Sequence, residues 1–337
     1  MPDPTFLIGA VMAMALTAYA LLGGADYGGG VWDLLATGST AEQQRATISR
    51  AIAPVWEANH VWLILVVTVL FTAFPPAFAW MGTYLHIPLM LALVGIVLRG
   101  SAFMFRAYAP GKERRRWRWI FDGASTGTPL LLGMIVGAVT EGRIDTAARS
   151  GFRALFVDPW LTPFALSVGA FTLVLFAYLA AVYLTLEARE AKVADAFRAR
   201  ALASGVLAAV MALLVFGLAG RVQDLRAGLT SSAWALPLHV ATGLAATGAF
   251  VSLWIRRFWW ARTATIAQVA LIILGWALAQ YPYLVRPHLT FQATAAPRAT
   301  LVLLLQTLAV GAVILTPSLL YLFRIFGPPE NRHQRRR

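Results

Sequence analysis

The chain has 337 residues, of which 59% are hydrophobic and only 13% are charged, and it contains no cysteine. With a mean hydropathy of +0.68, this composition excludes an ordinary soluble domain and predicts an all-α polytopic membrane protein, a single transmembrane domain over residues 1–337. The lack of cysteine excludes disulfides, thiolate-bound iron–sulfur clusters and thioether-attached haem.

Nine apolar spans follow one another along the chain, separated by charged or Pro/Gly-rich connections. Each is long enough to cross a bilayer as a helix of about 20 residues. The predicted spans cover residues 6–35, 51–75, 77–105, 117–141, 160–186, 199–221, 235–255, 263–283 and 299–323. None of the connections is long enough to hold a soluble domain.

The net charge of +13 does not indicate a nucleic-acid partner, because the basic residues lie in short loops between the spans. Of the 28 lysines and arginines, 20 fall on the side that includes the C-terminal tail, seven fall on the other side, and Arg99 lies within a span. Positively charged loops stay in the cytoplasm. We therefore expect the N-terminus outside the cell and the C-terminus in the cytoplasm.

The first span carries a glycine-rich run, residues 23–30, around Asp26. The run is unlike a phosphate-binding loop, because no Lys-Ser/Thr pair follows it and no soluble strand precedes it. Small residues let membrane helices approach closely. This predicts tight packing of the first span and brings Asp26 within reach of a neighbouring helix.

The second span opens with Glu57 and His60, which stand three residues apart and so project from one face of a helix. Ionisable groups inside a membrane helix are costly unless they are paired or hydrated. The pair is therefore a candidate functional site.

Five ionisable residues on the first four spans fall in the same half of the membrane, the half nearer the cytoplasm. At about 1.5 Å per helical residue, Asp26 lies ~15 Å deep, Glu57 ~9 Å and His60 ~14 Å. Arg99 and Asp122 lie close to the cytoplasmic ends of their spans. Matching depths predict an ion pair between Arg99 and Glu57 and a hydrogen bond between Asp26 and His60.

A structural role competes with function for each of these residues, because polar side chains often serve only to tie membrane helices together. Structural pairing is the favoured interpretation for Arg99. A proton or cofactor environment is the favoured interpretation for Asp26, Glu57 and His60. Asp33 and Asp122 lie nearer the interface, where solvation and function are equally compatible with their positions.

A resemblance to a known family rests on residues 24–30, Gly-Ala-Asp-Tyr-Gly-Gly-Gly, followed after a short basic loop by residues 52–64, which include Ala-Pro-Val-Trp-Glu-Ala-Asn-His-Val-Trp. The segment around Arg99, Trp-Arg-Trp at 117–119 and Gln-Tyr-Pro-Tyr at 280–283 strengthen it. The chain resembles, over almost its whole length, subunit II of the cytochrome bd-type quinol oxidases, in the cyanide-insensitive branch.

The resemblance implies two four-helix bundles plus a peripheral helix, in the inner membrane of a bacterial cell. The partner would be a subunit I of similar fold that carries haems b and d and oxidises quinol, with a small third subunit in some complexes. Subunit II would support subunit I, help to conduct protons from the cytoplasm, and in some members provide an oxygen route or hold a quinone. No catalytic residue or metal-ligand set is expected in this chain.

By position, Asp26, Glu57 and Arg99 match the polar positions of the family's motifs, with Arg99 as a structural ion pair. The proton-path candidates are Asp26, Glu57, His60 and Asp122. Trp62, which ends the signature of the second span, is a candidate for an oxygen route or a subunit interface. The chain also departs from some members, which have carboxylates where it has Gly23 and Met104.

The alternative function is a proton-coupled secondary transporter, because buried carboxylates beside broken helices are equally natural there. Two features count against it: the sequence has no convincing inverted repeat, and its ionisable residues crowd into the first four spans.

Overall fold

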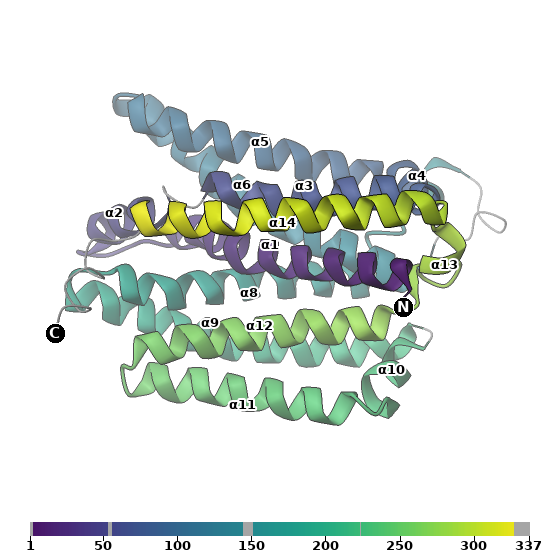
Figure 1. Ribbon diagram of the computed structural model, residues 1–337. Coiled ribbons are helices and arrows are strands. Elements are labelled where there is room, and N and C mark those ends of the chain that lie inside the picture. Colours follow the sequence, from purple (N-terminus) through teal and green to yellow (C-terminus); the bar gives the residue numbers. More distant parts are fainter. Residues whose placement is uncertain (1–2, 53–55, 144–150, 223, 327–337) are drawn as a thin grey trace.

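The computed structural model describes residues 3–52, 56–143, 151–222 and 224–326, and these are almost entirely helical (Figure 1). In chain order the elements are α1 (Pro4–Leu34), α2 (Ala41–Ile52), α3 (Trp56–Ala73), α4 (Pro75–Tyr84), α5 (His86–Tyr108), α6 (Gly111–Glu141), α7 (Phe152–Phe156), α8 (Pro163–Glu187), α9 (Ala191–Leu218), the 3-10 turn η1 (Ala219–Arg221), α10 (Leu225–Ser231), α11 (Ala235–Trp254), α12 (Phe258–Gln280), β1 (Tyr283–Val285), β2 (Leu289–Thr290), α13 (Phe291–Thr294) and α14 (Arg298–Phe326). The two strands form a small antiparallel hairpin.

Side-chain caps and prolines stabilise the starts of two of the long helices. The Asp3 side chain accepts a hydrogen bond from the backbone N–H of Thr5 at 3.1 Å, and Pro4 occupies the first turn of α1. Thr162 caps α8 in the same way, with Pro163 following it. Each cap satisfies a backbone donor that the helix leaves unpaired, and proline is tolerated in the first turn.

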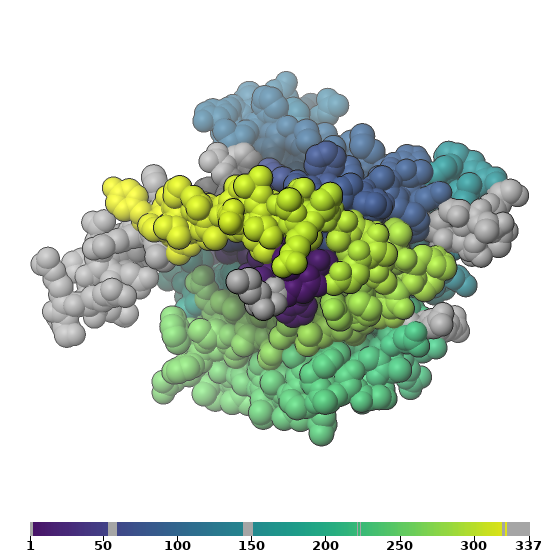
Figure 2. Space-filling model, turned by 45° about the vertical axis from the view of Figure 1, so that its right-hand side comes forward, coloured from purple at the N-terminus to yellow at the C-terminus, as the bar shows by residue number. Residues whose placement is uncertain are grey.

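The helices sort into two bundles joined along their length. One bundle consists of α1, α3, α5 and α6, and the other of α8, α9, α11 and α12, with α8 packed against both α1 and α6. Helix α14 contacts α1 and α3 and lies on the outside of the molecule (Figures 1 and 2). The expected arrangement of two four-helix bundles plus a peripheral helix is confirmed.

Within the described residues, eight helices are long and apolar enough to cross a membrane alone, and α3 with α4 gives a ninth crossing if that bent pair counts as one. The predicted spans 51–75 and 77–105 need correction. The first starts within α2, and the second runs across α4, which bends by 116° from α3. Pro75 and Pro76 lack the N–H groups that would continue α3, so the helix stops at Ala73.

Helix α6 also differs from the expectation. It begins at Gly111, six residues before the predicted span 117–141, so the basic run of residues 112–116 is helical and not a loop. Its other end matches the prediction: the helix closes at Glu141, and Gly142 takes the left-handed conformation at φ +60°.

The close helix approach predicted for the glycine run of α1 is confirmed. A Cβ atom at Gly28 would overlap the carbonyl oxygen of Phe176 on α8. One turn further along α1, the indole N–H of Trp32 donates to the carbonyl oxygen of Ala177 at 2.7 Å. The contact between the two bundles therefore depends on the absence of a side chain at this position.

Replacing Gly28 with alanine should destabilise the protein by about 1–3 kcal/mol, because the added methyl group forces α1 and α8 apart. The midpoint of thermal unfolding of the purified membrane protein measures this loss. Gly123→Ala is the matched control, since no atom lies within 4 Å of the added Cβ there. Equal unfolding midpoints for the two variants would contradict this packing.

Candidate functional site

A buried arginine lies at the centre of the first bundle. Arg99 of α5 is 1% exposed, and its Nη2 donates to Oδ1 of Asp26 on α1 at 2.6 Å. Its Nε donates to the hydroxyl oxygen of Ser125 on α6 at 3.0 Å. The guanidinium also lies 4.6 Å from the ring centre of Tyr27 and 5.0 Å from that of Phe121. A charge removed from water this far is stable only because it is paired and hydrogen-bonded.

Helix α3 completes this arrangement through Asn59, whose side-chain amide donates to Oδ2 of Asp26 at 3.3 Å. We refer to Asp26, Asn59, Arg99 and Ser125 as the first charged layer. It ties four helices together around one carboxylate, which Arg99 and Asn59 both contact. Asn59 was not predicted, because a neutral amide gives no signal when only charged residues are searched.

The structure tests the predicted pairings only in part. Arg99 pairs with Asp26, a partner that matching depths did not suggest, and the side chain of Glu57, the other member of the predicted pair, lies outside the described residues. The hydrogen bond that the structure describes from α3 to Asp26 comes from Asn59, the neighbour of His60. His60 itself is half-buried on α3.

A second charged layer lies two helical turns further along α1 and α5. It consists of Asp33, Arg45, Arg106 and Asp122. Arg106 donates to Oδ2 of Asp33 at 2.9 Å, and Nε of Arg45 lies 3.6 Å from Oδ1 of the same carboxylate. Asp33 follows Asp26 by seven residues, and Arg106 follows Arg99 by seven, which is about 10 Å along each helix.

Asp122 joins this layer from α6 and interacts with both Asp33 and Arg106. It is 2% exposed, and its Oδ1 has no hydrogen-bond partner among the described residues. Asp122 is thus a buried carboxyl group beside a second carboxyl group. The prediction left solvation of Asp33 and Asp122 open, and the structure buries both.

The ring of Phe121, which is fully buried, connects the two layers. The guanidinium of Arg106 lies 3.9 Å from its centre, and that of Arg99 lies 5.0 Å from it. An aromatic face attracts cations, so one ring helps to hold both arginines in place.

Several polar atoms around the layers are buried without a hydrogen-bond partner among the described residues. They include the hydroxyl group of Thr128, the amide oxygen of Asn59, and one carboxyl oxygen each of Asp33 and Asp122. Such atoms are rare in folded proteins, and water is their usual partner. Buried charges, hydroxyls and water together are what proton transfer through apolar protein requires.

The sequence did predict that Asp26, Arg99 and Asp122 lie in one region, and the structure brings them together in two adjoining layers. Trp62 is half-buried against the main hydrophobic core. Arg106 was missed, and solvation and function were left equally open for Asp33, because each lies near the end of its span. The seven-residue repeat from Arg99 and Asp26 was the signal that could have found them.

The histidine at the start of α5 is held by neighbours within this chain. His86, at the start of α5, contacts the carbonyl oxygen of Thr83 through Nδ1 at 2.8 Å, and its ring packs against Phe156. The described ranges hold no group of three or more His, Cys, Asp or Glu that could bind a metal ion. The interior between the bundles is filled, with Phe176 packed against the glycines of α1.

Comparison with known proteins decides the family. The family model of cytochrome bd terminal oxidase subunit II matches residues 4–326. The chain belongs to this family. The chain is therefore a subunit of a respiratory quinol oxidase. This function replaces the alternative of a proton-coupled transporter.

Individual relatives agree. The bd oxidase structure from Geobacillus thermodenitrificans superposes with a TM-score of 0.80 at 25% identity, over 96% of this chain and 99% of that one. A Bacillus subtilis (strain 168) protein, provisionally named as subunit II of a cytochrome bd menaquinol oxidase, is 24% identical over 91% of each chain. Subunit 2 of the cytochrome bd-I ubiquinol oxidase of Escherichia coli (strain K12) is 27% identical over 62% of this chain and 54% of its own length.

Proposed function

We propose that this subunit II supports a haem-bearing subunit I and conducts protons to it from the cytoplasm. The observation that carries the proposal is the pair of adjoining charged layers. They are buried in an otherwise apolar bundle, beside polar atoms that have no hydrogen-bond partner among the described residues. Charged groups are retained inside membrane bundles at a cost, which a role in ion or proton movement explains.

The two layers have different roles in this proposal. The second layer receives protons, because the carboxyl group of Asp122 beside Asp33 can hold and release one. In the first layer, Arg99 and Asn59 hold the side chain of Asp26 in place, and Asp26 orients water along the route. Structurally, the ion pair between Asp26 and Arg99 also locks α1 to α5.

Glu57 and His60 extend the proposed route onto α3, where they share one face of the helix. Glu57→Gln keeps the shape of the side chain but cannot relay a proton. We expect an assembled complex with normal haem content and turnover per haem reduced about tenfold or more. Oxygen consumption divided by haem absorbance measures this.

Glu42→Gln is the matched control for this test, because Glu42 is an exposed carboxylate on the neighbouring helix α2. Full turnover in an intact Glu57→Gln complex would remove Glu57 from the route. Loss of assembly with unchanged turnover per haem would assign Glu57 to helix packing alone.

The partner and its cofactors follow from the same reasoning. Haems b and d are assigned to subunit I in this proposal, and family membership supports haem cofactors in the complex as a whole. The substrate class is a quinol; the curated relatives are named for menaquinol and for ubiquinol. The proposal also allows a small third subunit in the complex and a quinone bound to this chain. Trp62 is the candidate for an oxygen route or for the subunit interface.

The orientation is part of the proposal. The excess of basic residues on the C-terminal side, 20 of 28, places that side in the cytoplasm. The second layer lies nearer to this side than the first, because α1 and α5 both run towards it. Protons from the cytoplasm therefore meet the second layer before the first.

A further inference from the structure

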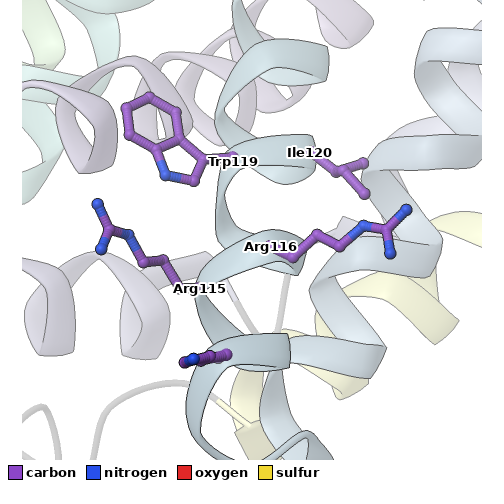
Figure 3. Close-up of a pocket in the computed structure, with 5 residues that line it drawn as sticks. Arg115, Arg116, Trp119 and Ile120 are labelled. Carbon is purple, nitrogen blue, oxygen red and sulfur yellow. The ribbon is translucent and has the colours of Figure 1, made fainter.

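An open hollow of about 610 Å³ lies on the first three turns of α6, and none of the residues that line it belongs to the charged layers. It is lined by Lys112, Arg115, Arg116, Trp119 and Ile120. These residues are spaced three and four apart, so they form one stripe along the helix. Figure 3 shows Arg115 and Arg116 on either side of the helix axis, with Trp119 and Ile120 one turn further along.

The three cations of this stripe are uncompensated. All three are exposed, and within the described ranges none of them forms a salt bridge or a side-chain hydrogen bond. Their mutual repulsion is a cost that a bound anion would remove. Positive charge at this end of the span is enough to orient the protein, but orientation does not require the cations to line one hollow.

The other end of the stripe is apolar. Trp119 is 54% exposed, and Ile120 continues the wall towards the membrane-spanning part of α6. On α5, Phe105 stacks on Trp117 at 4.7 Å and is itself 53% exposed. Exposed aromatic residues at a span end mark the depth of the lipid headgroups, which places the three cations at the level of the phosphates.

We propose that this hollow binds the headgroup of an anionic phospholipid. Lys112, Arg115 and Arg116 would contact the phosphodiester, while Trp119 and Ile120 would pack against the glycerol and the upper acyl chain. A cationic end joined to an apolar wall fits a lipid better than it fits free phosphate, which has no apolar part. The proposal is independent of the proton route, because it uses none of the residues of the charged layers.

The test uses the complete complex with its haem-bearing subunit in detergent, titrated with phosphatidylglycerol and observed by native mass spectrometry. The variant K112Q/R115Q/R116Q should bind this lipid at least about tenfold more weakly than the wild type. The control R189Q/K192Q/R257Q removes the same charge from exposed residues of other helix ends and should change binding less than about twofold. Phosphatidylcholine should bind equally to all three proteins.

Four outcomes would overturn the proposal. Equal weakening in both triple variants would mean that only bulk charge matters. Displacement of the lipid by inorganic phosphate would identify a free-anion site. Unchanged lipid binding with loss of subunit I from K112Q/R115Q/R116Q would mean that the stripe contacts protein. Unchanged lipid binding in Trp119→Ala would remove the apolar wall from the site.

Discussion

Replacing Arg99 with methionine should leave little assembled oxidase in the membrane. The substitution keeps an apolar chain in place but leaves the carboxylate of Asp26, 3% exposed, without its cation. Removing one partner of a buried ion pair costs about 3–5 kcal/mol. The haem absorbance of the solubilised membrane, compared with the amount of this subunit by immunoblot, measures the loss.

The double variant Asp26→Leu/Arg99→Met separates the ion pair from a simple packing effect. Replacing both charges with apolar groups removes the uncompensated carboxylate, so assembly should recover in large part. Turnover per haem should stay low in the recovered complex, because Asp26 also orients the proton route in our proposal. Wild-type assembly of the single variant Arg99→Met would contradict the structural role of the pair.

Asp122→Asn should have the largest effect on turnover. The change is nearly isosteric, and the described structure gives Asp122 no salt bridge to break, so the complex should assemble with its haems. An amide cannot release a proton, and turnover per haem should fall about 100-fold. Oxygen consumption with excess quinol measures it.

Two further variants serve as controls for the Asp122→Asn experiment. Glu113→Gln removes an exposed carboxylate from the same helix and should leave turnover unchanged. Asp122→Glu retains a titratable group and should recover part of the activity. If Asp122→Asn instead lowers haem content with normal turnover per haem, Asp122 acts in packing alone.

The sequence predicted which residues of the first bundle are buried near one another but not how they pair. Depth along a helix follows from residue count, and it placed Asp26, Glu57 and Arg99 in the same half of the membrane. Pairing also depends on the direction in which each side chain leaves its helix. That direction is set by the packing of α1 against α5 and α6, which brings Arg99 to Asp26.

The second layer was predicted only in part, through Asp122 and the alternatives left open for Asp33. Asp33 and Arg106 lie near span ends, where charged residues are common and usually solvated. Their burial follows from the length of the helices: α5 runs to Tyr108 and α6 begins at Gly111, so the bundle remains packed beyond the predicted spans.

The break between α4 and α5 was outside the reach of hydropathy. Residues 77–105 read as one apolar span, although α4 ends at Tyr84 and α5 begins at His86. The proline pair at 75–76 marks the break between α3 and α4, which lies at the predicted boundary between the spans 51–75 and 77–105.

The most direct test of the proton route is proton uptake during oxygen reduction. The fully reduced complex in proteoliposomes is mixed with oxygen, and a pH dye outside the vesicles reports uptake at the face that carries the second layer. In Asp122→Asn we predict that uptake slows by the same factor as turnover, with haem content unchanged. Proton uptake at the wild-type rate in this variant would contradict the account.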